Sequence, residues 1–316
     1  MEAGRVFGRI VDFGCLLASV PTAPIVALLA RLGPVRLPAT YRLWDSAGVT
    51  PIPHHYYQPI PRMPDLPERT WLRDSLAGID INVSGQLSLL QQLNYHQELS
   101  SLPVEDSGVE GQYFYNNSMF GPGDAEVYYS LIRHFKPKRI IEIGGGYSTL
   151  IAQLAVRAGG APTEHICVEP YECPWLENVG LTQIVRSRVE DVSVDLFSSL
   201  RENDILFIDS SHVLRTGGDV WFEYLQVLPR LNPGVLVHVH DIFLPYPYPK
   251  EWLTVRRLFW TEQYLLQAIL QNNSRLKVVL ALQFLSKEFQ SELARACPVY
   301  AVQRHRNPGS FWMCTC

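Results

Sequence analysis

The stretch Arg139-Ile-Ile-Glu-Ile-Gly-Gly-Gly-Tyr-Ser-Thr149 predicts a buried strand, a glycine turn and the start of a helix. Its isoleucines are typical of a strand that is covered on both faces of a sheet. The three consecutive glycines allow a sharp turn and a close approach of the backbone to a ligand. Ser148 or Thr149 can cap the following helix, whose free N–H groups and dipole favour an anionic group. The stretch therefore predicts a site for a nucleotide-like cofactor.

An acid inside the strand indicates which cofactor this is. The dinucleotide-binding fingerprint has a third glycine where Thr149 stands. Glu142 lies two residues before Gly144, where a carboxylate suits a cationic amino group and would repel a pyrophosphate. The pattern Glu142-x-Gly144-x-Gly146-x-Ser148 resembles motif I of the class I S-adenosylmethionine-dependent methyltransferases, with Ser in place of the usual last Gly.

Composition indicates a globular chain. The 316 residues are 47% hydrophobic and 18% charged, which is enough for a large core. The formal net charge of −4 argues against a nonspecific nucleic-acid binder, so we expect no nucleic-acid partner. The six cysteines form no CxxC pair, which argues against a zinc site and favours a reduced, cytoplasmic setting.

The N-terminal region is unusually apolar. Residues 13–30 carry no charge, but Pro21 and Pro24 interrupt them, and Asp12 and Arg31 bracket them. Since a spanning helix needs about 20 apolar residues and prolines break helices, we expect apolar helical structure over residues 11–32 that does not cross a bilayer. It would contact the body, a second copy of the chain, or a membrane surface as a peripheral segment.

The domain boundary is expected near residue 110. Prolines are frequent between residues 33 and 67 and predict irregular structure, and short helical segments follow. We therefore expect an N-terminal accessory region over residues 1–110. Residues 111–316 would form the cofactor-binding domain.

Polar side chains end the later strands of the predicted sheet. Glu169 ends the second strand, 23 residues after Gly146, near the spacing of roughly 20 at which such folds bind ribose hydroxyls. Glu190 or Asp191, after the third strand, could accept a hydrogen bond from an adenine amino group. The fourth and fifth strands end in a set of acids and histidines, namely Asp209, His212, His240 and Asp241. Ligands of open α/β sheets bind beyond these strand ends, so the set is expected to converge.

The run from Tyr113 to Asp241 resembles the class I methyltransferases more widely. Phe207-Ile-Asp-Ser-Ser-His212 and His240-Asp-Ile242 are similar to the macrocin O-methyltransferase-like group, which acts on sugars and natural products. The resemblance implies a Rossmann-like, seven-stranded, mostly parallel sheet with helices on both faces and a reversed edge strand near Ser310–Cys314. It also implies cofactor-binding roles for Glu142, Gly144, Gly146, Ser148, Glu169, Asp191 and Asp209.

We therefore expect S-adenosylmethionine-dependent O-methylation of a small polar, sugar-like or natural-product acceptor. His212 or His240 could serve as the base, with Asp241 as a third catalytic residue. Alternatively, Asp209 and Asp241 could hold Mg²⁺ or another divalent cation, and two acids at neighbouring strand ends favour this reading. The rival functions are an NAD(P)-dependent oxidoreductase, which Glu142 and Thr149 oppose, and a non-catalytic scaffold.

Overall fold

The computed structural model describes residues 2–316, with side chains described from Gly8 onward, and it divides into two compact units. The first unit covers residues 1–68 and the second covers residues 69–316. We expected the boundary at residue 110, but the helices that follow residue 69 belong to the second unit. Its helices α3 (Val83–Gln92) and α4 (His96–Ser100) pack against α12 (Gln290–Ala296) and α13 (Pro298–Val302).

A seven-stranded sheet forms the centre of the second unit, in the order β3-β2-β1-β4-β5-β7-β6. The predicted Rossmann-like fold is confirmed. The last strand is reversed as predicted, but it lies between β5 and β6 and not at the edge. The strands are β1 (Arg139–Ile143), β2 (Glu164–Val168), β3 (Gln183–Val185), β4 (Ile205–Ile208), β5 (Leu236–Val239), β6 (Leu276–Ala281) and β7 (Phe311–Thr315).

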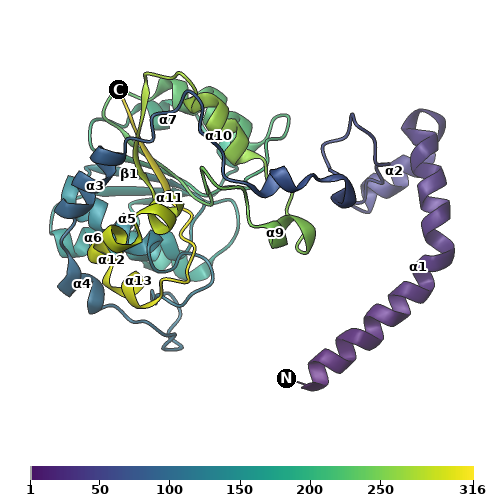
Figure 1. Cartoon of the computed structure of the whole chain (residues 1–316), viewed down its shortest axis with the longest axis horizontal. Helices are drawn as coiled ribbons and strands as arrows, with labels where there is room; N and C mark the ends of the chain where they lie inside the picture. Colours follow the sequence, from purple (N-terminus) through teal and green to yellow (C-terminus); the bar gives the residue numbers. More distant parts are fainter. Residues whose placement is uncertain (1) are drawn as a thin grey trace. The chain divides into compact units, whose positions relative to one another are not determined.

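The core lies on the central strands, where both faces are buried. The helices α5 (Asp124–Phe135) and α6 (Tyr147–Gly159) pack against each other beside β1 (Figure 1). Rings stack across β4 and β5, with centroids of Phe207 and His238 3.9 Å apart and those of Tyr128 and Phe207 4.7 Å apart. This packed layer holds the carboxyl ends of β4 and β5 in fixed positions.

Short helices complete the second unit. Residues 250–270 form two helices, and positive φ at Arg257 lies in the break between them. This break places Glu262 at the start of the second helix. The remaining helices are α7 (Val194–Ser198), α8 (Asp219–Phe222, continued by a π-helical turn), α9 (Lys250–Thr254), α10 (Glu262–Leu270) and α11 (Leu282–Glu288).

The first unit contains a long helix, α1 (Glu2–Arg36), and a short one, α2 (Pro38–Ser46). We expected Pro21 and Pro24 to break the apolar segment, but the helix continues through both, and Gly33 is its non-helical residue. A proline removes one backbone N–H donor from the helix, but its own backbone angles can remain helical, so the helix can continue past it. Within residues 2–316, the stretch Gly8–Arg36 is the one helix long and apolar enough to cross a membrane.

Candidate active site

The turn between β1 and α6 is packed on one side and open on the other. Gly144 has a φ of +86°, and a Cβ at this position would overlap the carbonyl oxygen of Asp209 at the end of β4. A Cβ on Gly146 would meet nothing within 4 Å, and its backbone is extended, with a φ of 177°. Gly144 is therefore required for packing the turn on β4, whereas Gly146 leaves open space for a ligand.

Two residues predicted to bind the cofactor lie beneath this turn. Glu142 and Ser148 are buried, and the Ser148 hydroxyl donates to Glu142 Oε1 at 2.6 Å. Glu142 Oε2 lies 2.9 Å from Nε2 of His165 on β2. These interactions use both oxygens of Glu142 inside the core, and neither residue lines the cleft beside the turn, so their direct contact with a cofactor stays a prediction. At the N-terminus of α6, the hydroxyl of Thr149, and not that of Ser148, accepts a hydrogen bond from the Gly146 N–H at 3.0 Å.

Glu169 follows β2 and faces a cleft of about 440 Å³. Its two carboxylate oxygens accept hydrogen bonds from the backbone N–H groups of Gly145, at 3.0 Å, and Tyr171, at 2.9 Å. Gly144 and Asp209 line the same cleft. The structure thus brings together three of the predicted cofactor-binding residues, from the ends of β1, β2 and β4.

Of the two acids that could accept from an adenine amino group, Glu190 lines the cleft and Asp191 does not. Glu190 lines the cleft and pairs with Arg188, whereas Asp191 is exposed and does not line it. Both residues belong to a tight 3₁₀ turn, Val189–Asp191, in which successive side chains point in different directions. The sequence could not decide which of the two adjacent acids faces the cleft.

The acids and histidines that end β4 and β5 converge as predicted. His212 Nε2 lies 3.3 Å from Asp209 Oδ1 and 3.8 Å from Asp241 Oδ2. His240 Nδ1 lies 3.5 Å and 3.7 Å from the same two oxygens. His212 and Asp241 have positive φ values of 60° and 53°, a backbone conformation that is uncommon for such residues and concentrates at functional sites. We call these four residues the His–Asp cluster.

Two further acids hold the histidines of the His–Asp cluster, and the sequence reading missed both roles. Glu262 is fully buried at the start of α10, and its Oε2 lies 2.8 Å from Nδ1 of His212. Asp124 Oδ2 lies 4.0 Å from Nε2 of His240, and its carboxylate also accepts the backbone N–H of Ser310 at 2.7 Å. Glu262 lies on the same face of α10 as Leu266. A carboxylate on this apolar face was the feature of the sequence from which a buried role for Glu262 could have been predicted.

Charge in the His–Asp cluster is balanced between the rings and the carboxylates. Burial alone would lower the pKa of His240, but the charges of Asp241 and Asp209 raise it to about 10. Burial likewise opposes protonation of His212, yet its bonds with Asp209 and Glu262 raise its pKa well above the usual value. Burial would raise the pKa of Asp209, but the two histidines hold it well below its usual range. The surrounding carboxylates therefore favour the protonated form of both rings.

The carboxylates are the more accessible members of the His–Asp cluster. The side chains of Asp209 and Asp241 are 31% and 19% exposed, against 7% for each histidine. A ligand that enters from the cleft side therefore meets the carboxylates first, with the two rings directly behind them. Asp209 also lines the cleft beside the glycine turn, so it joins the two parts of the site.

The expected metal ligands are paired with the rings. Nε2 of His212 lies 3.3 Å from Asp209 Oδ1 and 3.8 Å from Asp241 Oδ2. The N–H of a protonated ring would therefore lie between the two carboxylates, where a cation bound by both would have to sit. Across the described part of the chain, no group of three or more His, Cys, Asp or Glu side chains is arranged to hold a metal ion. The residues in their present arrangement do not fit a divalent cation, and we derive no step through one.

Aromatic side chains form a wall beside His212. The ring centroid of Trp260 lies 4.3 Å from that of His212 and 5.0 Å from that of Trp252. Tyr248, from the proline-rich loop after β5, extends the wall at 6.0 Å from Trp260. This wall gives an apolar surface next to the polar groups of the His–Asp cluster.

Comparison with known proteins connects this site to a family. Residues 141–242 match a protein family described as a methyltransferase domain. An uncharacterized protein of Archaeoglobus fulgidus is 30% identical over 165 residues, which cover 48% of this chain and 75% of that protein. Residues 141–242, which match the family, run from β1 to the end of β5 and include the glycine turn, Glu169 and the whole His–Asp cluster.

Solved structures that are similar to the chain include two methyltransferases. One is the SAH-bound methyltransferase of Podospora anserina, which is 17% identical, with a TM-score of 0.38, over 75% of this chain and 88% of that one. Another is the O-methyltransferase of Bacillus cereus in complex with SAH, which is 13% identical, with a TM-score of 0.34, over 73% of this chain and 90% of that one.

Proposed function

Because the chain belongs to the same family as the archaeal relative and carries a methyltransferase domain, we propose that it transfers a methyl group from S-adenosylmethionine to a hydroxyl group. The observation that supports this best is the position of Asp209, which lines the cofactor cleft and also belongs to the His–Asp cluster. A methyl donor in the cleft and a hydroxyl at the cluster would therefore meet at one carboxylate.

The cleft has groups that suit each part of the cofactor. Glu169 has lone pairs beyond those used by its two backbone donors and would hold the ribose hydroxyls. Glu190 would accept from the adenine amino group, and Asp209 would attract the cationic amino group of the methionine part. The open space above Gly146 admits the ligand to the turn. When bound, S-adenosylmethionine supplies an electrophilic methyl group.

The chain itself must orient the acceptor hydroxyl and take its proton. We propose that the acceptor hydroxyl lies against Asp209 and Asp241 and that the neutral form of His212 accepts its proton at Nε2, which leaves an imidazolium ion beside the two carboxylates. Glu262 fixes the other nitrogen of the ring, as a positioning residue, and so keeps Nε2 directed at the two carboxylates. The neighbouring carboxylates raise the pKa of His212, so the fraction of neutral ring that can act as a base increases as the pH rises.

The acceptor that we propose is a small sugar-like or natural-product molecule. The aromatic wall of Tyr248, Trp252 and Trp260, whose rings meet edge to face, provides apolar ring surface against which a ring can pack. The carboxylates beside the wall are acceptors for the hydroxyl groups that such molecules carry. The combination of a ring-binding surface and hydroxyl-binding acids supports this acceptor class.

The test is release of S-adenosylhomocysteine from S-adenosylmethionine in the presence of a panel of sugars, phenols and other hydroxyl compounds. We expect product with hydroxyl acceptors, loss of turnover by about 10²-fold or more in His212→Ala, and unchanged activity in EDTA. Product with amine or thiol acceptors alone would contradict O-methylation. Loss of activity in EDTA that Mg²⁺ restores would replace the histidine base with the metal-assisted reaction predicted from the sequence.

A further inference from the structure

We propose that α1 is a membrane anchor that spans a lipid bilayer. This proposal is independent of the chemistry proposed above. It rests on the length of the uncharged stretch, on the distribution of exposed apolar side chains around the helix, on its internal hydrogen bonds and on the residues at its two ends.

The uncharged stretch has the length of a bilayer core. Residues 13–30 carry no charge and lie within one continuous helix. At 1.5 Å per residue these 18 residues extend about 27 Å, close to the hydrocarbon thickness of about 30 Å. Arg9 and Asp12 precede the stretch, and Arg31 follows it, so charged groups stand at both ends of an apolar cylinder.

Large apolar side chains point outward on every side of this helix. Successive residues turn by about 100°, so Ile10 and Leu28 lie on one side, Val26 on the opposite side, and Val11 and Leu16 between them. All five are between 42% and 65% exposed. A partner protein covers one stripe of a helix, whereas lipid surrounds it, and a helix that is apolar all round is typical of a membrane span. The distribution therefore favours lipid over a second copy of the chain.

The polar groups within the stretch are satisfied by the helix itself. The Ser19 hydroxyl donates to the Cys15 carbonyl at 2.7 Å, and the Thr22 hydroxyl donates to the Ala18 carbonyl at 3.0 Å. In lipid no water is available, so backbone and side-chain polar groups must pair internally. Prolines such as Pro21 and Pro24 are tolerated in spanning helices under these conditions.

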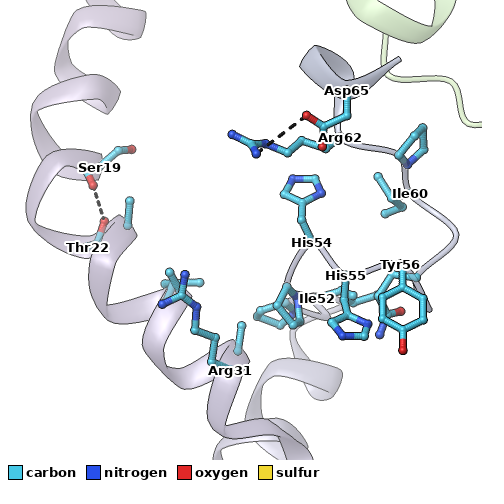
Figure 2. Close-up of a pocket in the computed structure, with 18 residues that line it drawn as sticks. Ser19, Thr22, Arg31, Ile52, His54, His55, Tyr56, Ile60, Arg62 and Asp65 are labelled. Carbon is cyan, nitrogen blue, oxygen red and sulfur yellow. Dashed lines mark hydrogen bonds and ion pairs between the residues drawn. The ribbon is translucent and has the colours of Figure 1, made fainter. Parts of the chain in front are cut away.

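The end of the stretch has the features of a membrane–water boundary. Gly33 interrupts the helix just after Arg31, and Tyr41 of α2 packs back with its hydroxyl 3.5 Å from the Ala30 carbonyl. Tyr41 pairs edge-to-face with Trp44, and Tyr and Trp are enriched at this depth of a bilayer. Figure 2 shows His54 and Arg62 of the following segment across a cleft of about 1040 Å³, which the helix lines with residues between Ser19 and Arg31. In a bilayer this polar segment would instead lie in water beyond Arg31, away from the inserted part of the helix.

The test uses the full chain expressed in cells, with membranes separated from aggregates by flotation. We expect the protein in the floating fraction, resistant to high salt and alkaline carbonate and released by detergent. The double variant Leu17→Asp/Val20→Asp should move to the soluble fraction. The matched control Val35→Asp/Leu43→Asp, at exposed positions outside the stretch, should stay with the membrane.

Three results would overturn the proposal. Release by alkaline carbonate would show a surface-bound helix. A soluble oligomer of the full chain that dissociates in Leu17→Asp/Val20→Asp would show that α1 binds a second copy. An intact mass that lacks the N-terminal residues through the end of the apolar stretch would show a cleaved signal sequence. Equal thermal unfolding of the two double variants verifies that the second unit remains folded in both.

Discussion

Replacing Glu169 with Ala should weaken binding of S-adenosylhomocysteine without unfolding the protein. A carboxylate has about four lone-pair sites, and the backbone N–H groups of Gly145 and Tyr171 use two of them. The remaining sites face the cleft and would accept from the two ribose hydroxyls. Hydrogen bonds to a charged group contribute about 1.5–3 kcal/mol, so the dissociation constant should rise roughly 10- to 150-fold.

Titration calorimetry of the variant and the wild type measures this change directly. Glu169→Gln keeps the shape and one acceptor oxygen, so its loss of affinity should be intermediate. Glu172→Ala, at an exposed position three residues along the chain, is the matched control and should bind as the wild type does. Wild-type affinity in Glu169→Ala, with an unchanged melting temperature, would refute the assignment of the ribose site.

Gly146→Val should abolish cofactor binding with the fold intact, whereas Gly144→Ala should lower the melting temperature, because only the latter Cβ overlaps Asp209; thermal unfolding with and without S-adenosylhomocysteine separates the two effects. Glu262→Gln should lower kcat by about 10²-fold and move the rising limb of the pH profile to lower pH, since Glu262 raises the pKa of His212; an unchanged profile would contradict its positioning role. The pKa of His240, about 10 in the folded state, lies above its unfolded value, so its stabilising contribution is complete below about pH 6.5 and is lost as the pH rises through 10. The melting temperature of the wild type should therefore fall over this range more than that of His240→Gln, and parallel curves would contradict this.

The fold and the convergence of the site could be predicted, because each buried strand is recognisable in the sequence and is followed directly by the polar residues of the site. The isoleucines of β1 and the spacing to Glu169 determine a parallel sheet with its ligand site at one edge. Asp209, His212, His240 and Asp241 could be placed together for the same reason. The sequence also showed that Asp209 and Asp241 end neighbouring strands, and from this it predicted a cation between them.

The remaining features depend on side-chain directions and on contacts between distant parts of the chain. Glu142 could not be recognised as a core residue, because its partner His165 lies 23 positions away on β2. The bond from Glu262 to His212 joins residues 50 positions apart and depends on the break between α9 and α10. The choice between Glu190 and Asp191 depends on the rotation of a single turn.

Titration of the full chain in detergent with S-adenosylhomocysteine, and separately with NAD, shows which cofactor the cleft binds. We predict saturable binding of S-adenosylhomocysteine with one molecule per chain, lost in Gly146→Val, and no heat of binding with NAD. Binding of NAD without binding of S-adenosylhomocysteine would contradict the account and identify an oxidoreductase on the same sheet, and binding of neither would leave a scaffold.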